Sequence, residues 1–209
     1  MKKIHSQESG RSMVEMLGVL AIIGVLSVGG IAGYSQAMNK FKVTKTTDQI
    51  QTMITNIRTL FSTQSTYNGV STYSTMYTTG ILNDENCPSG GASCSPVNPY
   101  GGSIQLASIK ENNIANKGFA IAYSGLPTDA CVRLAMQGWG DASSGLTAVG
   151  AYNTAPTIAD STPTEGNAAN GAVIRVTREA NKVPLSLIDA NQGCSGGDGN
   201  AASIVLYFR

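Results

Sequence analysis

The sequence has a single histidine, His5, and charged residues make up only 13% of its 209 positions. The rest of the chain therefore has no imidazole, which excludes catalytic triads, general bases and metal sites built on histidine. The chain also lacks a Gly-x-Ser-x-Gly motif, a phosphate-binding P-loop and a metal-binding run. These absences predict a protein that is not an enzyme and that uses neither a cofactor nor a metal.

Acidic side chains offer no obvious alternative chemistry. Asp141, Asp160 and Asp189 are far apart in the sequence, and we interpret them as solvated or helix-capping residues rather than an acid pair. The run Gly-Gly-Asp-Gly-Asn at 196–200 contains oxygen ligands of the kind that bind calcium, but it is shorter than a known calcium loop. A turn is the favoured interpretation of that run.

The charges are nearly balanced, with 14 basic and 13 acidic side chains. Binding to nucleic acid normally requires a clustered basic surface, so the composition argues against a nucleic-acid partner. A nearly neutral surface instead suits a protein that packs against copies of itself.

A long uncharged segment follows the N-terminus. The run from Met16 to Ala32 contains no charged residue, and with its flanks it approaches the roughly 20 residues that cross a bilayer as a helix. Glu15 lies at the entrance to this segment, where an intramembrane carboxylate costs about 3 kcal/mol or more unless it is paired. The segment therefore predicts a membrane-bound stage and a cationic partner for Glu15.

Cleavage after Gly10 would supply that partner. The new amino terminus on Arg11 would lie four residues before Glu15, about one helical turn away. The same ammonium group would also be able to reach Glu15 of a neighbouring copy. The spacing of Gly10 and Glu15 thus suggests a processing site that precedes assembly.

Gly10, Glu15 and the following apolar helix together resemble the class III signal of type IV pilins and the related pseudopilins. In that family a prepilin peptidase cuts after the glycine and methylates the new amino terminus. The resemblance implies cleavage between Gly10 and Arg11, and a role for Glu15 in placing subunits in register during assembly. Arg11 departs from the family, which usually has Phe, Met or Leu at this position.

The resemblance also implies an α+β fold, in which a long N-terminal helix packs on an antiparallel sheet head. The implied parts are a leader at 1–10, a membrane and filament-core helix at 11–35, an amphipathic helix at 36–64, and a head at 65–209. Within the head, the span 131–194 resembles the disulfide-bounded C-terminal region of type IV pilins, particularly type IVb.

The implied function is that of a structural subunit of a type IVb-like pilus, used for adhesion, aggregation, motility or DNA transfer. The implied partners are further copies of the chain, a prepilin peptidase, an assembly ATPase with its inner-membrane platform, an outer-membrane secretin, and lipid before assembly. The chain would first reside in the inner membrane with its head outside the cytoplasm, and later in an extracellular pilus.

Other interpretations remain open at this point. A minor pilin or a type II secretion pseudopilin would share the same signal. An ordinary secretory signal or a plain membrane anchor on a binding domain would explain the basic Lys2 and Lys3 and the apolar run. Neither of these gives a reason for Gly10 and Glu15 at their spacing.

Four cysteines, Cys87, Cys94, Cys131 and Cys194, predict two disulfides in a chain that carries an export signal. Sequence alone permits three pairings, of which we favour Cys87 with Cys94 and Cys131 with Cys194. A tetrathiolate zinc site is disfavoured, because Cys131 and Cys194 have no cysteine close by in the sequence.

Beyond the apolar run, six apolar residues recur at spacings of three and four and indicate one face of a helix. They are Ile50, Met53, Ile54, Ile57, Leu60 and Phe61. Without an interrupting proline, one helix from Ser12 to Thr63 is expected, about 80 Å long, although two separate helices are also compatible with the sequence. Gly29 and Gly30 are candidate points of local unwinding, and Gly29 with Gly33 forms a Gly-x-x-x-Gly pair.

In the head, alternating or continuous apolar residues predict strands at 103–109, 117–124, 172–177 and 202–208, the last of them central in the sheet. Short helices are predicted at 130–137 and 183–191.

The connections are predicted to include a surface loop at 65–80 and a long, exposed, irregular region at 140–171 with an apolar patch at 146–149. Asn98 to Gly102 form a strong turn signal. Trp139, the only tryptophan, is interpreted as a packing residue.

Overall fold

The computed structural model describes residues 9–158, 163, 166–168, 172–177, 183–195 and 201–209. The chain divides into two compact units, the first ending at Phe41 and the second beginning at Lys42. Helix α1, Ser9–Phe61, contributes to both units. The long N-terminal helix expected from Ser12 to Thr63 is confirmed, and the helix is not interrupted at Gly29 or Gly30.

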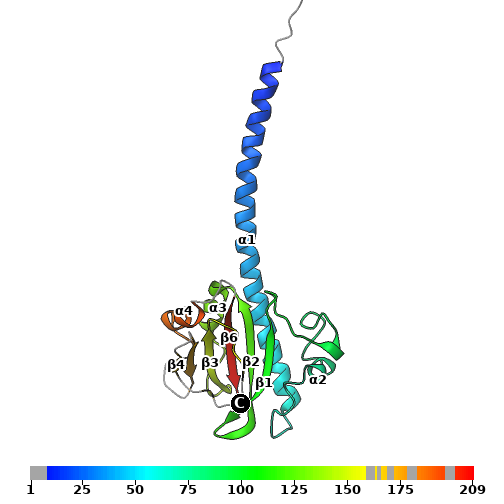
Figure 1. Cartoon of the computed structure of the whole chain (residues 1–209), viewed down its shortest axis with the longest axis vertical. Helices are drawn as coiled ribbons and strands as arrows, with labels where there is room; N and C mark the ends of the chain where they lie inside the picture. Colours follow the sequence, from blue (N-terminus) through cyan, green and yellow to red (C-terminus); the bar gives the residue numbers. More distant parts are fainter. Residues whose placement is uncertain (1–8, 159–162, 164–165, 169–171, 178–182, 196–200) are drawn as a thin grey trace, which may run out of the picture. The chain divides into compact units, whose positions relative to one another are not determined.

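The head is built on a six-stranded antiparallel sheet with the strand order β1-β2-β6-β3-β5-β4 (Figure 1). The strands are β1 Ile104–Glu111, β2 Ile114–Leu126, β3 Leu146–Tyr152, β4 Gly166–Ala168, β5 Ala172–Val176 and β6 Ala202–Phe208. The helices are α2 Tyr73–Thr78, α3 Thr128–Ala135 and α4 Leu187–Cys194, with a short 3-10 turn at Gly91–Ser93. The predicted α+β class is confirmed.

Alternation along each strand gives the sheet two different faces. On β2, Phe119, Ile121 and Tyr123 join the main core, while Ala120 and Ala122 belong to a smaller cluster on the opposite face. The main core contains the apolar side of α1 within the second unit. Apolar residues recur about every 3.6 positions on that part of α1 and every two positions on β2. The two apolar faces that result are buried in one core.

Strand β6 lies between β2 and β3 and is buried along its whole length. Its central position agrees with the prediction from its apolar sequence. Residues Ile204, Leu206 and Phe208 join the main core, whereas Val205 and Tyr207 face the smaller cluster. A strand that is apolar on both sides is stable only where both faces of the sheet are covered.

The region 140–171, predicted to be irregular and exposed, contains strands β3 and β4, so that prediction was wrong there. Strand β3, Leu146–Tyr152, is almost fully buried between β6 and β5. Its sequence contains Gly150 and two alanines, which have weak strand propensity. The strand forms because backbone hydrogen bonds to neighbours on both sides outweigh that weak propensity. Residues 159–162, 164–165 and 169–171 lie outside the described part of the chain.

Two smaller differences concern helices. The predicted loop 65–80 contains α2, where Met76 is buried and its carbonyl accepts hydrogen bonds from the backbone N–H groups of Ile81 and Leu82. Helix α4 begins at Leu187, later than predicted, because the Ser186 side chain accepts a hydrogen bond from the Asp189 N–H and caps the first turn.

The turn at 98–102 ties the start of the sheet to β2. The Asn98 side chain donates to the Ser124 carbonyl at 2.7 Å and accepts from the N–H groups of Tyr100 at 2.9 Å and Gly102 at 3.1 Å. Asn98 is buried, and a buried amide with its hydrogen bonds satisfied holds a turn in one conformation. At Gly102, an added Cβ would lie 1.8 Å from the Ser124 oxygen.

Replacing Gly102 with alanine should lower the free energy of unfolding by about 2–3 kcal/mol, because the backbone at the turn must move away from β2 and weaken the Asn98 hydrogen bonds. Urea unfolding of the chain in detergent measures this loss. Gly138→Ala is the matched control, since a Cβ there meets no atom within 4 Å. Equal stability of the two variants would contradict the steric argument.

Candidate assembly site

The N-terminal part of α1 carries an apolar surface that is exposed all round. Large apolar side chains from Met13 to Tyr34 are at least half exposed, for example Val25 at 76% and Ile31 at 71%. The helix that contains this stretch is the one helix, within the described part of the chain, that is long and apolar enough to cross a membrane. Soluble proteins rarely expose so large a continuous apolar surface.

Two serine hydroxyls in and next to this stretch are satisfied inside the helix. The Ser27 hydroxyl donates to the Ile23 carbonyl at 2.7 Å, and the Ser35 hydroxyl donates to the Ala32 carbonyl at 3.0 Å. Internal satisfaction of this kind is what a lipid environment requires. Glu15 is the only charged side chain between Met13 and Asn39, and it is exposed.

The predicted processing residues lie at the start of the same helix. Gly10 and Arg11 belong to the first turn of α1, and Glu15 lies just over one turn further along. An amino terminus created on Arg11 would therefore be close to Glu15 along the helix axis. Cleavage between Gly10 and Arg11 and the assembly role of Glu15 stay predictions.

Glycines in the apolar stretch have no packing role within the part of the chain that the structure describes. An added Cβ at Gly18, Gly24, Gly29, Gly30 or Gly33 would meet no atom within 4 Å. Glycine also costs about 1 kcal/mol relative to alanine in a helix interior. Close approach of another helix would give these positions a use, because small residues let helix backbones come together in a membrane or a bundle.

Two disulfides stabilise the head. Cys87 is bonded to Cys94 and Cys131 to Cys194, the pairing favoured from the sequence. The second bond joins α3 to the end of α4, and both of its cysteines are buried in the main core. Trp139 packs in the same core, and its indole N–H donates to the Leu134 carbonyl at 2.7 Å. The disulfide-bounded region is thus part of the folded core.

Asp189 is not an isolated carboxylate, which corrects the sequence interpretation. Its two oxygens accept hydrogen bonds from Arg175 on β5, at 2.5 Å from Nη2 and 3.2 Å from Nε. The side chains are only 12% and 23% exposed. No spacing rule links residues 14 positions apart on a strand and a helix, so sequence reasoning missed this pair. Asp141 remains exposed, and hydrogen bonds from Ser143 and Ser144 lower its pKa. Asp160 lies outside the described residues.

Replacing Arg175 with methionine should lower the free energy of unfolding by about 2 kcal/mol, because it leaves the largely buried Asp189 carboxylate without its cation. Adding Asp189→Leu should restore part of the loss, and urea unfolding of both variants measures the difference. The exposed pair Lys45–Glu85 is the matched comparison, where Lys45→Met should cost under about 1 kcal/mol. Asp189→Leu alone completes the set. A double variant whose loss equals the sum of the losses of Arg175→Met and Asp189→Leu alone would contradict the pairing argument.

Tyr100, near the start of the sheet, has a raised pKa. The Lys42 ammonium lies 5.3 Å from the centre of the Tyr100 ring. Burial, with a further contribution from the Asp129 carboxylate, raises the pKa of Tyr100 to about 12. The phenol therefore stays neutral at physiological pH and acts in packing rather than in acid–base chemistry. Among the described residues, no three His, Cys, Asp or Glu side chains gather where they would hold a metal ion.

The apolar helix, the antiparallel sheet and the two disulfides can now be compared with known proteins. The model of the Bundlin family matches residues 35–203. The chain belongs to the Bundlin family. Members of this family are type IVb pilins, so the recognition made from Gly10, Glu15 and the apolar helix is confirmed. No curated protein matches the chain in sequence.

A solved structure agrees with this membership at the level of the fold. TcpA, a type IV pilin from the Vibrio cholerae El Tor biotype, superimposes with a TM-score of 0.55 at 16% identity, over 80% of this chain and 99% of the TcpA chain. A type IVb pilin from Salmonella typhi gives a TM-score of 0.49 at 19% identity, over 78% of this chain and 96% of that pilin. The fold shared with TcpA is that of a type IV pilin. Type IV pilins are structural subunits that form homo-oligomeric filaments.

Proposed function

We propose that this member of the Bundlin family is the structural subunit of a type IVb-like pilus, processed after Gly10 and polymerised through the first part of α1. The observation that carries the proposal is the apolar surface of α1, which is exposed all round and contains one charged side chain, Glu15. At about 25 cal/mol per Å² of apolar surface, leaving this stretch in water would be very unfavourable. It must be covered by lipid or by other helices.

The two kinds of cover correspond to two stages. Before assembly, the stretch lies in the inner membrane with the head outside the cytoplasm, and its two serine hydroxyls donate to backbone carbonyls of the same helix, as lipid requires. After cleavage, α1 helices of many copies bundle into a filament core, where the unoccupied space at the glycines permits close contact. The heads then form the shell of an extracellular pilus.

Glu15 connects the two stages. In lipid or in a helix bundle, its carboxylate needs a cation, and the sequence of α1 has no basic residue between Glu15 and Lys40, while Arg11 is the nearest one on the N-terminal side. The amino terminus formed on Arg11 of a neighbouring copy is such a cation. Processing is therefore required before the subunit enters the filament. A prepilin peptidase, an assembly ATPase with its membrane platform, and a secretin are the machinery that this sequence of steps needs.

The intact mass and N-terminal sequence of the chain test the proposal, measured in membranes and in sheared surface material with and without a prepilin peptidase. We expect a chain that begins at Arg11, is recovered abundantly from sheared material, and has a mass lowered by two disulfides. A processed chain present only in trace amounts would instead indicate a minor pilin or a pseudopilin. A chain that keeps Lys2 and Lys3 and stays in the membrane would show an anchored binding domain and overturn the proposal.

A further inference from the structure

Exposed apolar side chains are concentrated at one place on the second unit, which forms the head. Within its described part, three of the large exposed apolar residues lie where α3 ends and α4 begins: Met136 at 39%, Leu187 at 60% and Ile188 at 78%. The fourth, Ile114 at 55%, lies by itself at the start of β2. Single apolar residues are normal on a surface, whereas a group of them marks a surface that meets something else. We call Met136, Leu187 and Ile188 the α3–α4 patch.

The two parts of the α3–α4 patch are held together by the fold. The Leu185 N–H donates to the Ala135 carbonyl at 3.3 Å, which brings the chain before α4 against the end of α3. Leu185 itself is buried in the main core, and the disulfide between Cys131 and Cys194 joins the two helices a second time. The exposed residues that follow Leu185 therefore stand on a firm support beside the end of α3.

The patch belongs to the end of the head at which its chain begins. Lys42 is the first residue of the second unit. Just over one turn later, the Thr47 hydroxyl donates to the side chain of Gln137 at 3.2 Å, and Gln137 directly follows Met136. In Figure 1, α3 and α4 lie at the end of the sheet where the head's part of α1 begins. The patch is therefore on the side of the head that is connected to the apolar stretch of α1.

The connection between the apolar stretch and the head is short. The stretch from Met13 to Tyr34 is about 33 Å long as a helix, close to the roughly 30 Å of a bilayer's hydrocarbon core. From Tyr34 to Lys42 the same helix rises about 12 Å, and one headgroup layer takes up about 5–8 Å of that. While the stretch spans a bilayer, the lipid surface is therefore within reach of the head. Contact with it is an intramolecular event, so even a weak attraction gives a high docked fraction.

The size and surroundings of the patch favour lipid over a second protein. A stable protein interface uses about 20–30 residues on each side, far more than the three side chains of the patch. Burial in a lipid interface instead becomes more favourable in proportion to the apolar area, without a minimum size. The carboxylate next to the patch, Asp189, is already paired with Arg175 and so does not oppose contact with lipid.

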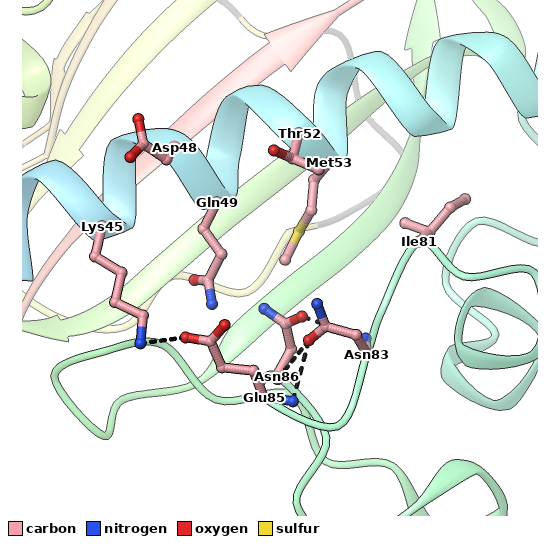
Figure 2. A pocket seen from close by; sticks show the side chains of 9 residues that line it. All are labelled: Lys45, Asp48, Gln49, Thr52, Met53, Ile81, Asn83, Glu85 and Asn86. Atoms are coloured by element: carbon pink, nitrogen blue, oxygen red, sulfur yellow. Dashed lines mark hydrogen bonds and ion pairs between the residues drawn. The ribbon is translucent and has the colours of Figure 1, made fainter.

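The side of the head formed by α1 and the loop 81–86 has a different chemistry. A cavity of about 210 Å³ lies there, lined in part by Gln49 and Asn86 (Figure 2). Lys45 and Glu85 form an ion pair at its rim. The Nδ2 nitrogen of Asn86 is enclosed and makes no hydrogen bond within the described structure. Charged groups at the rim are more stable in water than in lipid, so this side of the head stays in solvent.

We propose that the α3–α4 patch docks the head on the lipid surface before assembly. Met136, Leu187 and Ile188 insert between the headgroups and reach the upper part of the acyl chains. This contact is additional to the membrane span of α1, and it rests on the membrane-bound stage of the proposed function. Because the contact is apolar, a zwitterionic lipid suffices. Extraction of the subunit into a filament then includes the release of this patch from lipid.

Methionine methyl NMR of the full chain tests the docking, in phosphatidylcholine nanodiscs that hold one chain each and contain a lipid with a nitroxide on its headgroup. We expect the nitroxide to broaden the Met136 methyl signal, which is assigned with Met136→Leu. The double variant Leu187→Ser/Ile188→Ser removes two of the three inserted side chains. It should lower the docked fraction, and with it the paramagnetic relaxation of Met136, by about fivefold or more.

Ile114→Ser is the matched control, because it removes an exposed apolar side chain at the other end of the head. The hairpin that carries Ile114 is joined to the chain just beyond α1, where the Tyr67 N–H donates to the Asn116 carbonyl at 2.8 Å. The control should leave the relaxation of Met136 unchanged. All the replaced side chains are exposed, and an unchanged signal from the buried Met76 shows that each variant is folded.

Met16, inside the apolar stretch, separates failure of the docking from failure of the membrane stage, with a nitroxide placed on the acyl chain. If Met16 is relaxed but Met136 is not, or if the double variant relaxes Met136 like the unmodified chain, the docking is overturned while the proposed function stands. A Met136 signal that responds to a second chain in the disc but not to the lipid nitroxide shows that another copy covers the patch, and it also overturns the docking. If Met16 is not relaxed, the membrane stage and the docking are overturned together.

Discussion

Replacing Glu15 with alanine should reduce the yield of filaments by about tenfold or more while leaving cleavage after Gly10 unchanged. The variant removes the only charged side chain from the apolar stretch. In the proposed function, that side chain is the group that pairs with the amino terminus of the neighbouring copy. The remaining apolar surface still favours association but specifies no register, since dispersion contacts between helices are similar in many positions. If the pair between Glu15 and the amino terminus contributes about 1.4 kcal/mol, its loss lowers the affinity between two subunits by about a factor of ten.

The measurement is the amount of processed chain in sheared surface material relative to the amount in membranes. Ser27→Ala is the matched control on the same helix, because the Ser27 hydroxyl already donates to the Ile23 carbonyl of that helix. The control should assemble at the normal yield. A Glu15→Ala chain that is processed and still assembles fully would refute a role for Glu15 in registration.

Removing the bond between Cys131 and Cys194, by replacing both residues with alanine, should lower the free energy of unfolding by about 4 kcal/mol. The bond closes a loop with a sequence separation of 63 residues, and the entropy that a disulfide removes from the unfolded chain grows with the length of the loop. The Cys87–Cys94 bond spans only seven residues, so its removal should cost less, about 2.5 kcal/mol.

Urea unfolding followed by the fluorescence of Trp139 measures both losses, because Trp139 is the only tryptophan and is buried in the core beside α3. The Cys87/Cys94 double variant is the internal control for cysteine removal as such. If the short loop proved to be the more stabilising of the two, loop entropy would not be the dominant contribution of these bonds.

The long helix and several strands could be read from the sequence because local patterns specify them. The apolar face of α1 from Ile50 to Phe61 has a helical period, and β6 is a continuous apolar run, so each pattern agrees with the element that forms. The candidate assembly residues could also be located, since Gly10 and Glu15 are identified by spacing along one helix. Their function depends on other copies and on a peptidase, and it stays a prediction.

Other features depend on neighbours that are distant in the sequence. Strand β3 has a weak local pattern, and it is stabilised by hydrogen bonding to β6 and β5 on its two sides. The Arg175–Asp189 pair and the cavity beside Gln49 and Asn86 arise where strands, helices and a loop meet. No short-range rule predicts such encounters.

The sequence by itself determined that this chain has a long apolar segment with one carboxylate at its entrance, four cysteines outside that segment and a single histidine. Those properties follow from composition and from periods of two and 3.6 residues, which act over a few positions. The tertiary structure alone decided that β3 lies inside the sheet between β6 and β5, which carboxylate is paired, and where a buried amide is left without an acceptor. These depend on burial and on long-range hydrogen bonding, because the free energy of a buried polar group is set by the atoms that the fold places around it.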